Sequence, residues 1–530
     1  MKKACVFFAI ACLLLGVGMA SAEEQCEHLS TVKIADTTIT LAEMVTAGAF
    51  HGPPAPFTGA DISALYKSLP AFCRVVAEVK PTPDSDIKME VWLPVAGWNG
   101  KLQGIGNGGF AGEIDDLQLS LSVRAGYAAT ATDAGHSGNP GDATWAKGHP
   151  EKVIDFGHRG IHEMTRVAKA TAQAYYAKAP QRSYFAGCSD GGREALMEAQ
   201  RYPEDYDGIL AGAPASYWTR LLTLSAADTQ ALTADSASFV PATKIPAIAA
   251  AVNAACDEKD GVKDGILNDP RQCKFDPTAI QCKPGEESDT CLTTSQIATL
   301  NKIYAGLRDS HGQSLFPGYL PGAEGGPGGW GMWITGRAPG TGVIAYLSKA
   351  YFSNFVYENS EWDGKTFSVD ATLKAAEEKN GAALNAINLD LRAFKARGGK
   401  LILYHGWNDP AIPALNTINY YESVVAKMGQ KDLDSFVRLY MLPGVQHCVG
   451  GPGPDSFGFV GSTDPTHSMN AALEQWVENG VAPGTIIASK HAPGDWQHST
   501  MTRPLCVYPE AARYKGSGDT NDAANFTCQK

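Results

Sequence analysis

The chain has 530 residues, of which 44% are hydrophobic and 19% are charged, and its formal net charge is −12. This length and hydrophobic content are sufficient for a large buried core and predict more than one domain. The negative charge, without any run of basic and aromatic residues, argues against a nucleic-acid partner.

The N-terminus, residues 1–22, is typical of a cleaved signal peptide. Lys2 and Lys3 precede an apolar run that ends in the small residues Ala20-Ser21-Ala22. A lipid anchor at Cys12 is the alternative, but it would leave a very short apolar core. No later run is long enough to span a membrane, so we expect a secreted or periplasmic protein without a membrane span.

The cysteines support the same compartment. Of twelve, Cys5 and Cys12 fall in the signal peptide and ten remain, an even number that suggests five disulfides in an exported chain. Sequence spacing leaves their pairing open. No C-x-x-C motif supports a zinc ribbon or a thioredoxin site.

Residues 23–80 look irregular and predict an N-terminal wrap. Strands are then expected over 87–94 and 101–106, the second opening into the loop Asn107 to Phe110. In an α/β-hydrolase, a glycine-rich loop at this place supplies a backbone N–H to the oxyanion hole. We assign that role to Gly108, with Gly109 as the next candidate and an ordinary tight turn as the alternative.

The segment Ser183 to Ala213 predicts a strand, a sharp turn and a helix. Its centre, Gly187 to Gly191, fits the G-x-S-x-G nucleophile elbow, which exposes Ser189 at the carboxyl edge of a sheet. The N–H groups at the start of the following helix point to the same place, so the backbone of Asp190 is the second oxyanion candidate.

Strands and helices alternate over 87–215 and again from about 398 to 480, a pattern that predicts a mostly parallel sheet covered on both faces. Residues 216–396 do not follow this rhythm. We therefore expect an α/β-hydrolase catalytic domain formed by residues 23–215 and 397–530, with residues 216–396 inserted as a lid domain.

Asp409 and His447 complete a predicted catalytic triad with Ser189. Each follows an apolar strand, and the order Ser, Asp, His is that of α/β-hydrolases. The alternatives are a turn-forming aspartate and a surface histidine, and other histidines (His136, His405, His467) could in principle serve as the base.

Two cysteines flank this triad, since Cys188 precedes the serine and Cys448 follows the histidine. If Ser189 and His447 are hydrogen-bonded, the two cysteines come within the separation that a disulfide needs. A thiolate nucleophile at Cys188 is the competing idea, and the exported, cysteine-rich chain disfavours it.

These residues, Cys188-Ser189, Asp409 and His447-Cys448, resemble the paired-cysteine triad of the tannase/feruloyl esterase family. The resemblance extends over Trp98 to Gly112, the elbow, the acid loop Gly398 to Pro413 and a tail similar to bacterial members such as mono(2-hydroxyethyl) terephthalate hydrolase. It implies the pairs Cys26 to Cys73, Cys188 to Cys448, Cys256 to Cys273, Cys282 to Cys291 and Cys506 to Cys528.

The lid carries closely spaced carboxylates at Asp257, Asp260 and Asp264, beside glycines that turn the loop. Such oxygens suit a hard cation, although a solvated acidic turn explains them equally well. The resemblance implies a structural calcium ion (Ca2+) held by these three carboxylates and by the carbonyls of Val262 and Ile266. No organic cofactor is expected.

The predicted activity is serine ester hydrolysis through an acyl-enzyme. The resemblance implies aromatic acid esters, with feruloyl esters favoured, gallate esters second, and the terephthalate monoester disfavoured by Ile412, where that hydrolase has Phe. A catalytically inactive secreted binding protein is the alternative of a different class. Residues that could contact the aromatic substrate, or could equally form the lid core, are Trp330, Trp333, Arg337, Phe352 and Phe355.

Overall fold

The computed structural model describes residues 22–55, 59–458, 460–492, 495 and 498–530. The predicted signal peptide falls outside the described residues except for Ala22. Among the residues that the structure describes, no helix is both long and apolar enough to cross a membrane.

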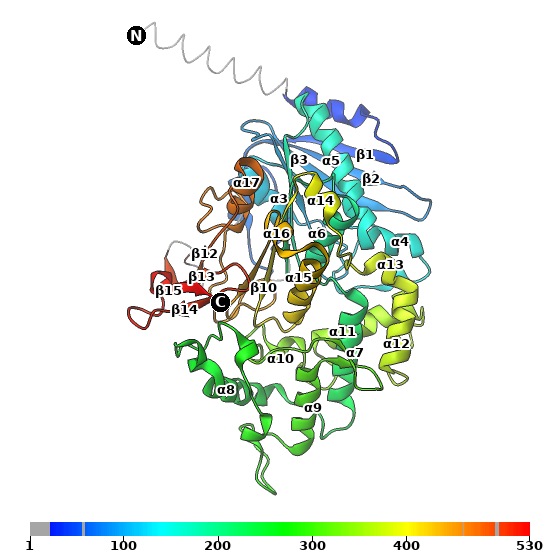
Figure 1. Cartoon of the computed structure of the whole chain (residues 1–530). Helices are drawn as coiled ribbons and strands as arrows, with labels where there is room; N and C mark the ends of the chain where they lie inside the picture. The colour runs from blue at the N-terminus through cyan, green and yellow to red at the C-terminus, as the bar shows by residue number, and fades with distance from the viewer. Residues whose placement is uncertain (1–21, 56–58, 459, 493–494, 496–497) are drawn as a thin grey trace.

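A nine-stranded sheet forms the upper part of the molecule in Figure 1. Its first four strands pair antiparallel, and from β5 onward all neighbours are parallel. The α/β prediction is confirmed, and the strand order places the elbow near the middle of the sheet. In spatial order the strands are β1 (Thr37–Val45), β2 (Phe72–Val79), β3 (Ile87–Pro94), β5 (Ala128–Thr132), β4 (Lys101–Ile105), β6 (Arg182–Cys188), β7 (Gly208–Gly212), β10 (Lys400–Gly406) and β11 (Val437–Leu442).

The N-terminal region differs from the sequence-based expectation. Residues 23–80 are not an irregular wrap, because β1 and β2 extend the sheet at one edge. Every second side chain of β2 is buried from Val75 to Val79, which is the period of a strand with one face in the core. The disulfide Cys26–Cys73 joins the start of the described chain to β2.

Helices cover both faces of the sheet because alternate strand residues point to opposite sides. Phe185, Ile209 and Leu401 pack under α5, α6 and α15, whereas Tyr184, Leu210 and Ile402 pack under α17. A third cluster lies beneath α3. These helices are α3 (Asp116–Arg124), α5 (Gly160–Tyr176), α6 (Asp190–Arg201), α15 (Leu415–Met428) and α17 (Met469–Asn479), accompanied by the short α2 (Ser63–Lys67), α4 (Pro150–Ile154), α14 (Arg392–Ala396) and α16 (Gln430–Asp434).

The segment predicted as a lid lies below the sheet in Figure 1 and is mainly helical. Its aromatic side chains form a hydrophobic cluster of their own, which reaches Phe110 and Phe156 on the sheet side and Ile412 in the acid loop. The division of the chain into domains stays a prediction. The lid elements are α7 (Trp218–Thr233), α8 (Ile245–Cys256), α9 (Thr294–Ala305), α10 (Trp330–Trp333), α11 (Val343–Tyr351), α12 (Val369–Ala376), α13 (Ala382–Leu384), β8 (Leu307–Arg308) and β9 (Ser314–Phe316).

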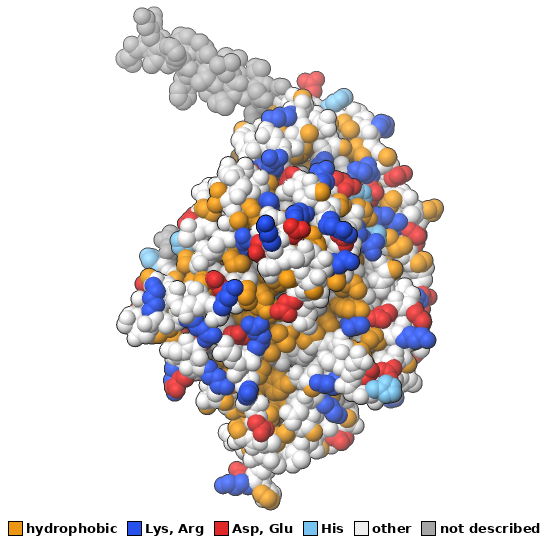
Figure 2. Space-filling model, viewed as in Figure 1, with side chains coloured by type: hydrophobic (Ala, Val, Ile, Leu, Met, Phe, Trp, Pro, Cys, Tyr) orange, Lys and Arg blue, Asp and Glu red, His pale blue; other side chains and the backbone are white. Residues whose placement is uncertain are grey.

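Two small antiparallel ribbons complete the C-terminal part, β12 (Ile486–His491) with β13 (Ser499–Leu505) and β14 (Ala511–Tyr514) with β15 (Phe526–Gln529). All five predicted disulfide pairs are present. On the face drawn in Figure 2, acidic and basic side chains are interspersed and no extended basic surface gathers.

Candidate active site

Ser189 occupies a strained turn between β6 and α6. Its φ of 65° lies in the left-handed region, which residues other than glycine rarely adopt. This conformation is typical of a nucleophile elbow. Glycines make the turn possible, since a Cβ at Gly187 would lie 2.4 Å from the Gly191 oxygen and one at Gly192 2.2 Å from the Gly212 oxygen. The predicted strand, turn and helix are therefore all present.

The loop after β4 lies directly beside the start of α6. The N–H of Gly191 donates to the Asn107 carbonyl at 2.8 Å, and the N–H of Asn107 donates to Glu194 Oε2 at 2.8 Å. Within the described chain, the N–H groups of Gly108 and Asp190 have no hydrogen-bond acceptor. Both N–H groups are thus unpaired within the described chain, and their role in an oxyanion hole stays a prediction.

The side chain of Asp190 has an interaction of its own, separate from any role of its backbone N–H. It is buried and paired with the equally buried Arg193, whose Nε lies 2.7 Å from Asp190 Oδ1. Burial raises the pKa of Asp190, and the Arg193 charge opposes that rise. The Arg193 guanidinium also lies 4.7 Å from the centre of the Phe156 ring, so the start of α6 is anchored to the core.

Asp409 and His447 meet at the carboxyl edge of the sheet. His447 Nδ1 lies 2.8 Å from Asp409 Oδ2, while Asp409 Oδ1 accepts the N–H groups of Ala411 and Ile412. Burial opposes ionisation of Asp409, but the His447 charge and the hydrogen bonds from His405 and His447 outweigh it and hold the Asp409 pKa below its usual range. A buried, ionised carboxylate can orient an imidazole and stabilise its protonated form.

The disulfide Cys188–Cys448, with a Cα–Cα distance of 6.0 Å, joins the residue before Ser189 to the residue after His447. No hydrogen bond between the Ser189 hydroxyl and the His447 ring is present in the described structure. Such bonds are often long without substrate and shorten when it binds. With Nδ1 on Asp409, the Nε2 of His447 is the nitrogen left for Ser189.

The residues predicted to contact substrate occupy different surroundings. Trp333 is half-buried, and its ring lies edge-on to His447 at 5.0 Å. Arg337 is exposed and has no ion pair among the described residues. Phe352 and Phe355 are 0% and 1% exposed and pack against Tyr351, so here they form lid core, which is the alternative named for them.

Ile412 and Trp330 also belong to the packed interior. Ile412 is buried, and its backbone N–H donates to Asp409 while its carbonyl lies 3.1 Å from His405 Nε2. Trp330 is fully buried, and its ring contacts Tyr304 at a tilt and Tyr319 edge-on. Trp333 is therefore the aromatic side chain of this predicted set that meets the triad.

The predicted calcium loop turns as expected, with Gly261 and Gly265 at positive φ. Burial, and further the Asp264 charge, raise the pKa values of Asp257 and Asp260. Their oxygens accept backbone N–H groups of the loop, and Asp264 pairs with Arg503 at 2.6 Å. This all-oxygen donor set suits a hard cation. However, no group of three or more such side chains is placed to hold a metal ion in the described chain, so calcium stays a prediction.

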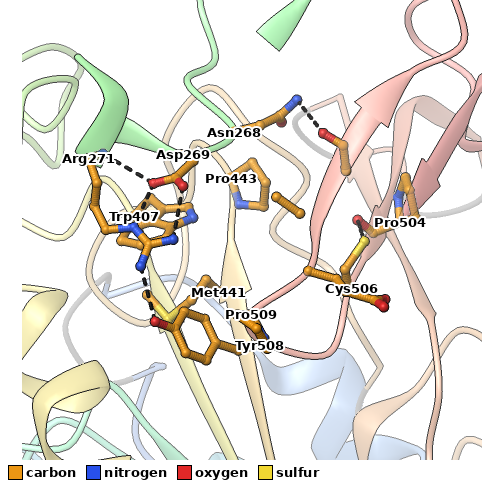
Figure 3. A pocket seen from close by; sticks show the side chains of 13 residues that line it. Asn268, Asp269, Arg271, Trp407, Met441, Pro443, Pro504, Cys506, Tyr508 and Pro509 are labelled. Atoms are coloured by element: carbon orange, nitrogen blue, oxygen red, sulfur yellow. Dashed lines mark hydrogen bonds and ion pairs between the residues drawn. The ribbon is translucent and has the colours of Figure 1, made fainter. Parts of the chain in front are cut away.

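A small cavity lies between this loop, the acid loop and the C-terminal ribbon (Figure 3). Arg271 spans it, with its guanidinium 5.3 Å from the Trp407 ring and a hydrogen bond of 3.0 Å to Tyr508. The cavity measures about 10 Å³, room for about one water molecule. It is too small for an aromatic ester, whereas the contact of Arg271 with Trp407 links the segment predicted as the lid to the loop that carries Asp409.

Comparison with known proteins agrees with this geometry. The family model for tannase and feruloyl esterase matches residues 73–529. The chain belongs to the tannase and feruloyl esterase family. An uncharacterized esterase of Xanthomonas campestris is 41% identical to it, over 96% of this chain and 92% of that one. A probable feruloyl esterase B of Aspergillus clavatus is 32% identical over 94% of both chains.

A solved structure supports the same assignment. The crystal structure of feruloyl esterase B from Aspergillus oryzae superimposes with a TM-score of 0.86 at 29% identity, covering 96% of this chain and 100% of that chain. The protein is accordingly a carboxylic ester hydrolase of the α/β-hydrolase type.

Sequence reasoning missed two supporting residues of this esterase. Arg193 has no role in the sequence-based prediction, and His405 appears there only as a possible base rather than as a neighbour of Asp409. The one signal available for His405 was its place at the end of a strand, four residues before the predicted acid.

Proposed function

We propose that this esterase is a secreted serine hydrolase of aromatic acid esters, with feruloyl esters as its preferred class. The observation that carries the proposal is the contact of 2.8 Å between His447 and a buried, ionised Asp409, beside a disulfide that ties His447 to the strained Ser189. In this proposal Ser189 is the nucleophile, His447 the base and Asp409 the orienting acid, and the N–H groups of Gly108 and Asp190 form the oxyanion hole.

The first half of the proposed reaction forms an acyl-enzyme. Ser189 Oγ attacks the ester carbonyl carbon while its proton passes to His447 Nε2, and the Nδ1–H of His447 stays on Asp409. The N–H groups of Asp190 and Gly108 hold the carbonyl oxygen as it becomes negative. His447 then gives its proton to the leaving alcohol.

Water completes the reaction by the same route. His447 Nε2 accepts a proton from water as the water oxygen attacks the acyl carbon. The bond from that carbon to Ser189 Oγ then breaks, His447 returns the proton to Oγ, and the free acid leaves. Asp409 stays ionised throughout and offsets the charge of the imidazolium. No step of this sequence uses the predicted calcium ion.

The surroundings of the triad support an apolar, aromatic substrate. The Trp333 ring next to His447 can pack against an aromatic acid. Met332 and Val449, close in sequence to Trp333 and His447, are 51% and 62% exposed. The preference for feruloyl esters over gallate esters or the terephthalate monoester follows from the similarity to feruloyl esterases of Aspergillus.

Labelling and turnover test the proposal together. A serine-directed phosphonate should label Ser189, and Ser189→Ala should abolish cleavage of methyl ferulate while the circular-dichroism spectrum is retained. Absence of labelling in the wild type would favour an inactive binding protein. Comparing kcat/KM for methyl ferulate, methyl gallate and the terephthalate monoester ranks the substrate classes, and a higher value for either of the last two contradicts the feruloyl preference.

A further inference from the structure

A second histidine contacts the triad aspartate. His405 is the penultimate residue of β10, is completely buried, and places Nε2 3.1 Å from Asp409 Oδ2. The same nitrogen lies 3.1 Å from the Ile412 carbonyl oxygen, and Nδ1 lies 2.7 Å from the Thr417 hydroxyl at the start of α15.

These contacts determine the protonation of the ring. Both neighbours of Nε2 are pure acceptors, a carboxylate and a carbonyl, so Nε2 must carry a proton. Thr417 can donate its O–H to Nδ1, so a neutral ring satisfies every contact. A neutral ring also avoids a second buried cation beside His447.

Asp409 therefore has a complete set of donors. Oδ1 takes two backbone N–H groups, and Oδ2 takes one imidazole N–H from His447 and one from His405. Four donors fix the plane of the carboxylate. Both imidazole N–H groups bind the same oxygen, Oδ2, so each interacts with only part of its negative charge.

We propose that His405 is a positioning residue for this esterase: through Nε2–H it holds the Asp409 carboxylate in the plane that His447 needs and weakens the attraction of Asp409 for protonated His447. This role rests on the proposed serine mechanism. His405 does not touch the substrate in this arrangement, because its two ring nitrogens are used by Asp409, Ile412 and Thr417.

Few other titratable groups face Asp409. From the lid, Tyr319 donates its hydroxyl to the Ala411 carbonyl at 3.4 Å and is itself close to the buried Asp228. From α15, the neutral Thr417 contacts His405. Removal of His405 should thus change the electrostatics of the Asp409–His447 pair more than that of any other described pair.

Two amide substitutions separate this role from packing. In His405→Gln the amide nitrogen reaches the place of Nε2 and can still donate to Asp409, whereas in His405→Asn it reaches only the place of Nδ1, near Thr417. We expect His405→Asn to lower kcat roughly tenfold or more, the effect of losing one hydrogen bond to a charged group, with little change in KM. The acid limb of its kcat/KM profile should move to higher pH, because Asp409 then attracts protonated His447 more strongly.

His405→Gln should keep the wild-type pH profile and most of kcat. Thr417→Val, which removes the contact on the other ring nitrogen, should lower the melting temperature and leave the acid limb in place. The proposal is overturned if Asn and Gln behave alike, or if activity follows the melting temperature across the three variants without any movement of the pH profile.

A second measurement does not depend on turnover. The His447 Nδ1 proton on Asp409 should give a low-field proton NMR signal, and this signal should shift in His405→Asn but not in His405→Gln. An unchanged signal in folded His405→Asn contradicts the proposal. Retained turnover in Ser189→Ala would instead contradict the serine mechanism, while the NMR signal would still report on the pair.

Discussion

Cys188 and Cys448 are bonded across a sequence separation of 260 residues, and this one covalent link ties the turn of the nucleophile to the loop of the base. We expect the double variant Cys188→Ala, Cys448→Ala to lose activity at least tenfold, because no covalent bond then holds the turn of Ser189 against the loop of His447. Unfolding in urea should show a stability loss of about 2–5 kcal/mol, the range typical of a native disulfide.

The matched control for that variant is Cys282→Ala, Cys291→Ala. This disulfide closes a short loop in the lid with a separation of 9 residues. Its removal should lower the melting temperature and leave kcat/KM unchanged. Equal losses of activity in the two double variants would show that the bond next to the triad has no special role.

Arg193 should be a major contributor to stability. It is completely buried and pairs with Asp190, so Arg193→Met leaves an uncompensated buried carboxylate and should cost about 3–5 kcal/mol in urea unfolding. Adding Asp190→Asn to that variant should recover part of the loss, because the unpaired charge is removed. Additive losses would contradict a direct interaction.

Acid stability should depend on His136. Its ring is buried, stacks on Trp145 at 3.7 Å, and neither nitrogen has a hydrogen-bond partner in the described chain. Burial lowers the pKa of His136 from 6.5 to about 3. Between these values the unfolded chain binds a proton that the folded chain does not, so stability falls as pH drops below 6.5, by about 3 kcal/mol at pH 4.

In His136→Phe the unfolded chain no longer binds this extra proton. The melting temperature of the variant should therefore fall less than that of the wild type between pH 7 and pH 4, as measured by calorimetry. The two proteins are compared by how steeply the melting temperature changes with pH. A constant difference in melting temperature caused by altered packing therefore does not affect the comparison. Parallel curves for the two proteins would refute a buried neutral His136.

Trp333 should act on substrate binding. Removing the ring in Trp333→Ala takes away the aromatic surface beside His447, so KM for methyl ferulate should rise several-fold with a smaller change in kcat. Trp362→Ala is the control within the lid, because Trp362 packs on Phe352 and Tyr357. It should lower the melting temperature without raising KM, and the reverse pattern would place the substrate elsewhere.

Calcium should stabilise the folded lid. If the loop of Asp257, Asp260 and Asp264 binds it, a chelator should lower the melting temperature and added calcium should restore it, by about 2.7 kcal/mol at a concentration of 100 Kd. Asp260→Asn should remove this response. A melting temperature that neither chelator nor calcium changes would mean that backbone N–H groups and Arg503 are the sole partners of these carboxylates.

The sequence by itself predicted most of the order of elements and supplied the motifs on which the proposed triad rests. These predictions rest on patterns within short segments: the periods of strands and helices, the glycines around Ser189, and the strands that precede Asp409 and His447. Such patterns can be recognised without knowing how distant segments pack. The five disulfide pairs came from the resemblance to a family, since spacing alone left many pairings open.

Tertiary structure decided what depends on packing between distant segments. It buried Phe352 and Phe355 in the lid core, brought residues 37–45 into the sheet as an edge strand, and set two histidines, 4 and 38 residues away in sequence, on one oxygen of Asp409. No period or motif specifies such contacts, because their geometry follows from how whole elements fill the space between them.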